Sequence, residues 1–226
     1  MRFAASGSGQ QGNSGKVKVG DIPAYPTIGE YISAKEVIIK EGLSVLRKAG
    51  ANSAVVAHCF VTSFVAYELV KSAKALGLSV DEDLTVKAAL LHDVGRAFTR
   101  GVLHAVKGAE YLAGLGYQRE LLLAVERHVG AGITEDQAAQ LGLPKRDYVP
   151  QTLEEKIVSF ADKLVEGTSI LGPDHVLARF EREFGKNSQQ LEMAKKLIDD
   201  MRNIYERSSV PALLGWKSNE KLELYL

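Results

Sequence analysis

The feature that most constrains this chain is a pair of polar residues, His92 and Asp93, at the end of an apolar stretch. The residues before the pair, 84–91, read Leu-Thr-Val-Lys-Ala-Ala-Leu-Leu and are typical of a helix that packs into a core. A carboxylate that leaves water loses several kcal/mol of hydration free energy unless a cation pairs with it. The fold must therefore supply a positive partner at this point.

Four of the five histidines and a second aspartate lie in similar surroundings, at His58, His92, His104, His128 and Asp162. Residues three, four and seven apart share one face of a helix, and by this rule each of these side chains falls among aliphatic or small neighbours. A single inward histidine is usually a hydrogen-bonded core residue. The whole set favours a bound metal, because imidazole nitrogen and carboxylate oxygen are ligands of transition metals.

A network of ion pairs is the alternative explanation for the two aspartates. In that network Arg96 would neutralise Asp93, and Lys163 would neutralise Asp162. The network would satisfy both carboxylates. It would not explain why nearly every histidine lies on an inward helix face, so we prefer the metal.

Helical periodicity, punctuated by glycines, predicts an all-α fold. The expected helices are 33–48, 52–76, 82–93, 104–115, 118–129, 152–166, 173–184 and 188–207. No segment shows the alternation that is typical of a β-sheet. After His128 we expect Gly130 to cap one helix and Thr134 to begin the next, although two glycines there would also let backbone N–H groups approach an anion.

The chain divides into three predicted parts. Residues 1–22, rich in Gly, Ser, Gln and Lys, are expected to form a flexible leader. Residues 23–207 are expected to form one helical domain whose motif core is 50–170, with additional C-terminal helices after residue 172 that cap a pocket or form a dimer surface. Residues 208–226 are expected to form a tail docked on this domain.

Composition indicates the setting of the protein rather than its function. The 28 basic and 28 acidic residues balance, so no overall charge favours nucleic acid or a membrane. The single cysteine, Cys59, cannot form an internal disulfide, and we interpret it as a core residue. The chain starts without a signal peptide and has no run near ~18 uninterrupted apolar residues. We therefore expect a cytoplasmic protein without membrane contact, with a homodimer left open.

The order of the polar residues resembles the HD superfamily of metal-dependent phosphohydrolases. Three blocks carry the resemblance, Ala88–Arg96, His104–Glu110 and Ala161–Leu164, and they lie in the family's order within residues 50–170. The resemblance implies an HD-domain helical bundle. It implies that one metal is held by His58, His92, Asp93 and Asp162, and that a second is held by His104 and His128, with Asp93 bridging the two. The expected cofactors are two divalent transition metal ions, iron, manganese or cobalt, with zinc or magnesium as further options.

Two close metals lower the pKa of bound water and neutralise phosphate oxygens. The resemblance therefore implies hydrolysis, through a metal-activated hydroxide, of a phosphate ester or anhydride in a small, nucleotide-like substrate. Asp93 and Lys107 are the predicted catalytic residues, and Arg96 and Lys107 the predicted substrate contacts, because each cation lies three residues beyond an expected ligand. A solvated face for Lys107 and an ion pair with Asp93 for Arg96 are the alternatives.

The ligand order leaves two other functions open. HD-fold oxygenases with a mixed-valence di-iron pair share this order and cleave a C–C or C–P bond, and a binding module would use the metal mainly to support the fold. The HD-GYP branch is not favoured, because its Gly-Tyr-Pro signature is absent after His128. The compact pattern is closer to the branch that hydrolyses dinucleoside polyphosphates. His175 lies outside the motif blocks and is expected to face solvent at a helix start.

Overall fold

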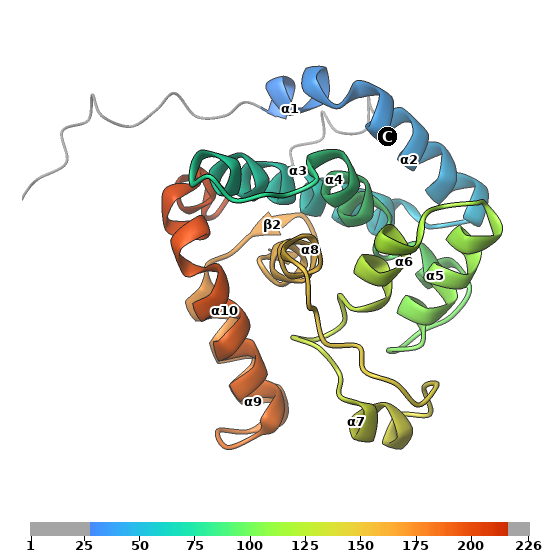
Figure 1. Ribbon diagram of the computed structural model, residues 1–226, viewed down its shortest axis with the longest axis vertical. Helices are drawn as coiled ribbons and strands as arrows, with labels where there is room; N and C mark the ends of the chain where they lie inside the picture. The colour runs from blue at the N-terminus through green and yellow to red at the C-terminus, as the bar shows by residue number, and fades with distance from the viewer. Residues whose placement is uncertain (1–27, 217–226) are drawn as a thin grey trace, which may run out of the picture.

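A computed structural model describes residues 28–216, which form a bundle of helices (Figure 1). The helices are α1 (Ile28–Ala34), α2 (Glu36–Ala49), α3 (Ser53–Ala75), α4 (Glu82–Leu91), α5 (His104–Gly114), α6 (Arg119–Glu126), α7 (Glu135–Gln140), α8 (Leu153–Lys163), α9 (Pro173–Phe184) and α10 (Gln189–Arg207), with short 3₁₀ helices η1 (Val94–Ala97) and η2 (Val210–Leu213). The predicted all-α fold class is confirmed.

The long helix α3 runs through the core and packs against α4, α8 and α10. Asn52 begins the helix by accepting a hydrogen bond from the backbone N–H of Val55 at 2.9 Å. Within residues 28–216, α3 is the one helix whose length and composition would allow it to cross a membrane. Because 67% of its most apolar window is buried inside the protein, packing within the bundle accounts for this composition.

Side-chain caps define where several helices begin. Asp81, Thr152 and Ser188 each accept a hydrogen bond from the backbone N–H three residues later, at the starts of α4, α8 and α10. Thr134 does the same for α7, and Gln137 bonds back to it to complete a capping box. The helix predicted to begin near Thr134 is therefore confirmed.

Two features of the predicted secondary structure were wrong. The helix predicted over 33–48 exists as α2, but it begins at Glu36 rather than Ser33, because the chain breaks at Lys35 between α1 and α2. A β-hairpin also exists, in which β1 (Val165–Glu166) pairs antiparallel with β2 (Ser169–Ile170). Two-residue strands are too short to show alternation. The turn depends on Gly167, whose φ of 60° favours glycine.

Three predicted helices end early, and each ends beside a predicted ligand. The helix predicted as 82–93 stops at Leu91, where the chain changes to η1. The helix predicted as 118–129 stops at Glu126, and the one predicted as 152–166 stops at Lys163. Four of the six predicted ligands, His92, Asp93, His128 and Asp162, therefore lie at or just beyond a helix end, where backbone carbonyls become free to accept other hydrogen bonds.

The end of the described chain packs on the bundle. Val210 and Leu213 of η2 are buried, and the carbonyl of Trp216 accepts a hydrogen bond from the backbone N–H of Ile170 at 3.0 Å. The leader 1–22 and residues 217–226 of the tail lie outside the described residues. The division into leader, domain and tail stays a prediction.

Candidate metal centre

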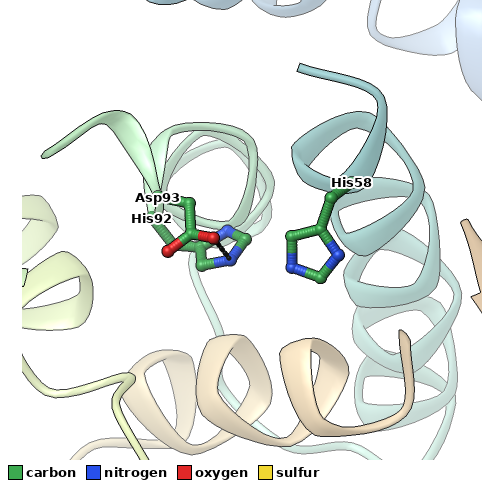
Figure 2. A group of neighbouring side chains, drawn as sticks. All are labelled: His58, His92 and Asp93. Atoms are coloured by element: carbon green, nitrogen blue, oxygen red, sulfur yellow. Dashed lines mark ion pairs between the residues drawn. The ribbon is translucent and has the colours of Figure 1, made fainter. Parts of the chain in front are cut away.

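The six predicted ligands, which are far apart in the sequence, come together between the helices. His58 lies on α3, His92 and Asp93 follow α4, His104 begins α5, His128 follows α6, and Asp162 lies in the last turn of α8. Figure 2 shows the side chains of His58 and His92 facing each other, with Asp93 beside His92. The ring centroids of His58 and His92 are 5.1 Å apart. The ligand atoms form three overlapping groups, each within 4.8 Å: His58, His92 and Asp93; His92, His128 and Asp162; and Asp93, His104 and His128.

The cluster is buried and opens to solvent on one side. His92, Asp93, His104 and His128 are at most 4% exposed. The side chains of His58 and Asp162 are each 15% exposed. Solvent therefore reaches the cluster from the side of His58 and Asp162, while the side of His104 and His128 is closed.

Backbone carbonyls fix the orientation of all four imidazole rings. The Nδ1 atoms of His58, His92, His104 and His128 lie 3.1, 2.8, 2.6 and 2.6 Å from the carbonyl oxygens of Gly167, Ala89, Gly101 and Val125. A carbonyl oxygen only accepts, so each Nδ1 must carry the hydrogen. When such a ring is neutral it presents the lone pair of Nε2, which is the arrangement found in metal-binding histidines.

These Nε2 lone pairs converge on carboxylate oxygens and on one another. The Nε2 atom of His58 is 3.0 Å from Oδ1 of Asp162, and that of His104 is 2.9 Å from Oδ1 of Asp93 and 3.0 Å from Nε2 of His128. Among the described residues, buried Nε2 of His92 and Oδ1 of Asp93 have no hydrogen-bond partner. Leaving these two buried polar atoms without a partner costs free energy, and a divalent transition metal would satisfy them.

The titration behaviour agrees with a site that demands positive charge. Burial raises the pKa of Asp93, but the charge of the neighbouring His92 opposes it and the pKa is held below its ordinary value. Burial lowers the pKa of His128 to about 4, so its ring is neutral near pH 7. Burial also lowers the pKa of His92, but the charge of Asp93 outweighs it and the pKa is raised.

The ion pairs considered from the sequence also exist, on the other oxygen of each carboxylate. Arg96 donates from Nε to Oδ2 of Asp93 at 2.5 Å. The ammonium of Lys163 contacts Oδ2 of Asp162 and donates to the carbonyl of His128 at 3.1 Å. The Oδ1 atoms, in contrast, face the histidines. Ion pairing and metal binding are therefore compatible.

Three other residues singled out from the sequence lie apart from the cluster. Lys107 is half exposed, and its ammonium pairs with Glu110 at 2.7 Å, so the structure does not bring it to the ligands and its catalytic role stays a prediction. His175 is exposed near the start of α9 and pairs with Glu166 at 2.9 Å. Cys59 is fully buried, and burial raises the pKa of its thiol, which is typical of a core residue.

Comparison with known families identifies the class of protein. The family model described as HD domain matches residues 55–166, which include all six predicted ligands. The chain belongs to the HD-domain family. This membership supports a metal-dependent phosphohydrolase in general terms, and it agrees with the helical fold and with the His/Asp cluster able to bind metal.

Several individual proteins are similar to this chain. An uncharacterised protein of Methanocaldococcus jannaschii is 44% identical over 165 residues, which cover 73% of this chain and 97% of that protein. Two relatives are named tRNA (cytidine(56)-2'-O)-methyltransferase. The one from Picrophilus torridus is 36% identical over 73% of this chain and 46% of its own length, and the one from Thermoplasma volcanium is 37% identical over 62% and 40%. This chain therefore spans less than half of each of these two proteins.

Among solved structures, the HD domain of the L. monocytogenes phosphodiesterase PgpH matches 71% of this chain and 98% of that domain. The two share 15% sequence identity, with a TM-score of 0.42.

Proposed function

We propose that this protein is a metal-dependent phosphohydrolase that cleaves a phosphate ester or anhydride of a nucleotide-like substrate. One observation carries the proposal: four imidazole Nε2 atoms and the Oδ1 atoms of two aspartates converge in a largely buried cluster, in which Nε2 of His92 and Oδ1 of Asp93 have no hydrogen-bond partner among the described residues. Membership of the HD-domain family supports the reaction type.

The six predicted ligands divide into two sets, one for each proposed metal ion. His58, His92, Asp93 and Asp162 would hold one ion, and His104 and His128, together with Asp93, would hold the second. When bound, such ions supply Lewis acidity, which lowers the pKa of water and neutralises phosphate oxygens. The histidines hold their rings in place through Nδ1, and the closed side at His104 and His128 excludes bulk water.

The charge of the centre favours an anionic substrate. With metal bound, the negative charges would be those of two carboxylates. The positive charges would be those of two divalent ions, Arg96 and Lys163, and the four histidines would be neutral. Such an excess of positive charge in a mostly buried site is offset better by a phosphate than by a neutral diol. This argument supports the hydrolase over an oxygenase that acts on a diol.

The nucleotide part of the proposal has separate support. Two relatives are named for a tRNA-modifying activity, so proteins similar to this chain occur within enzymes that act on nucleic acid. The compact set of six ligands is also closer to the HD branch that hydrolyses dinucleoside polyphosphates than to the HD-GYP branch.

The test begins with elemental analysis of the purified protein, followed by reconstitution with manganese, cobalt or iron. Phosphate release would then be measured with nucleoside monophosphates, diphosphates, cyclic nucleotides and dinucleoside polyphosphates. We expect hydrolysis of at least one class, lost with a chelator and restored by metal. Iron-dependent oxygen consumption without phosphate release would instead establish the oxygenase, and bound metal without turnover would indicate a binding module.

The predicted substrate contacts can be tested separately. Only Nε of the Arg96 guanidinium binds Asp93, and the side chain is 42% exposed, so its terminal N–H groups are free to reach a phosphate oxygen. A hydrogen bond to a charged group contributes roughly 1.5–3 kcal/mol, so Arg96→Ala should lower kcat/KM about 10- to 100-fold, mainly through KM. Lys107→Ala should also lower kcat/KM, by less.

Lys40→Ala is the matched control, because this exposed lysine pairs with Glu36 at 2.5 Å on α2. It should leave kcat/KM unchanged. If Lys107→Ala behaves like this control, the role proposed for Lys107 is wrong and its side chain belongs to a solvated helix face.

A further inference from the structure

Helix α8 carries a stripe of buried polar residues, none of which is a predicted metal ligand. Glu155, Ser159 and Lys163 are four residues apart and therefore share one face of the helix. They are 2%, 0% and 7% exposed. Three polar groups, two of them charged, are costly to bury unless each has a partner.

Each of the three has a partner in one short segment, Arg127–Gly130. Glu155 accepts two hydrogen bonds from Nη1 of Arg127, at 3.0 and 2.9 Å. Ser159 lies 3.3 and 3.4 Å from the carbonyl oxygens of His128 and Gly130, to which its hydroxyl donates. Lys163 donates to the carbonyl of His128 at 3.1 Å. Ser159 and Lys163 thus hold the backbone at His128 and Gly130, and Glu155 holds the side chain of Arg127, the residue before His128.

This segment needs external support because α6 has already ended. The helix stops at Glu126, so the carbonyls of its last turn and of the following residues have no helical partners. The ring of His128 is oriented by its own bond from Nδ1 to the carbonyl of Val125 at 2.6 Å. The stripe fixes the backbone from which that ring projects.

The same stripe reaches a second predicted ligand. The ammonium of Lys163 contacts Oδ2 of Asp162 while it donates to the carbonyl of His128. One buried cation therefore connects two ligands that belong to different helices. Asp162 and His128 also share one of the three groups of candidate ligand atoms, together with His92.

We propose that Glu155, Ser159 and Lys163 are positioning residues that set the place of His128 relative to Asp162, and thereby the affinity of the centre for its metal. The inference rests on the proposed metal centre and goes beyond it, because none of the three is a predicted ligand. Residues that orient metal ligands typically change metal affinity 10- to 100-fold when they are replaced.

The first experiment uses the metal-free protein. Long-range ¹H–¹⁵N spectra of the histidine rings should show His128 as the Nδ1–H tautomer in the wild type. Ser159→Ala and Lys163→Met should both shift the His128 ring signals. In Ser159→Ala the signals of His58 should stay in place, whereas Lys163→Met should also shift them, because Lys163 contacts Asp162 and Asp162 contacts His58. Ser72→Ala is the matched control, because this buried serine also donates to a backbone carbonyl, that of Ile204 at 2.7 Å, between α3 and α10. Unchanged His128 signals in both stripe variants would overturn the proposal.

The second experiment measures the affinity for manganese or cobalt by calorimetry. Lys163→Met should weaken metal binding about 10- to 100-fold, and Ser159→Ala should weaken it about 10-fold. Lys163→Arg should recover part of the lost affinity. Ser72→Ala should leave the affinity unchanged. Wild-type affinity in folded stripe variants, or an equal loss in the control, would overturn the proposal. If Lys163→Met does not fold, Ser159→Ala carries both tests. Phosphate release is not measured, so failure of the hydrolase proposal would leave this result intact.

Discussion

Replacing Asp93 with alanine is expected to abolish binding of both metal ions and to reduce hydrolysis to background, with helical content retained. Asp93 contacts ligands on both sides of the centre: its Oδ1 is 2.9 Å from Nε2 of His104, and its Oδ2 is 3.7 Å from Nε2 of His92. Without this carboxylate, neutral imidazoles would have to hold the second ion alone. Divalent ions bound this way lose most of their charge compensation.

The fold should survive the change because the partners of Asp93 tolerate its loss. Arg96 is 42% exposed and can be hydrated when the ion pair is gone. The measurement is elemental analysis beside circular dichroism. Asp83→Ala is the control, because Asp83 is an exposed carboxylate that pairs with Lys35 at 2.5 Å, and this variant should keep its metal. An Asp93→Ala protein with a full complement of metal would show that the ligand set is wrong.

Helical spacing in the sequence predicted that these side chains face inward, and the resemblance to the HD superfamily implied that the six lie together as ligands. The structure brings them close together, but neither source predicted how they are held, and their roles as ligands stay a prediction. The prediction that the side chain of His128 points inward was right, but its reason was wrong. His128 does not lie on a helix, because α6 ends at Glu126. The ring instead points inward because Nδ1 bonds to the carbonyl of Val125.

The supporting contacts could not be read from the chain because they involve backbone atoms brought together by tertiary structure. The carbonyl of Gly167, in the unpredicted hairpin, orients His58 across the gap between β1 and α3. The buried stripe on α8 was also missed. Glu155 and Ser159 each look ordinary in the sequence, and only their shared partners around His128 reveal a common role. The regular four-residue spacing of Glu155, Ser159 and Lys163 is the signal that was available.

The second large effect, on stability, is expected when Gly95 is replaced, because η1 lies directly against α5 at this residue. A Cβ atom at this position would overlap the backbone carbonyl of His104 and lie 2.5 Å from the backbone nitrogen of Gly108. These obstacles are backbone atoms, so no side-chain rotation can relieve them. Gly108 is itself a glycine facing Gly95, with a Cβ there only 3.1 Å from the nitrogen of Gly95. The close approach of the two segments therefore depends on hydrogen in place of Cβ.

Gly95→Ala should force α5 away from η1 and move His104 relative to Asp93. Overpacking of a core typically costs 1–3 kcal/mol, and a backbone clash belongs at the upper end, so we expect a loss of about 3 kcal/mol in the free energy of unfolding and a fall in Tm of roughly 6–12 °C. Metal binding at the His104 side should weaken as well.

Gly114→Ala is the control within α5, because nothing lies within 4 Å of the Cβ atom that an alanine would add there. This variant should leave the free energy of unfolding unchanged or raise it by up to ~1 kcal/mol. Thermal unfolding decides the matter: equal Tm values for the two variants would refute the close packing that places His104 in the centre.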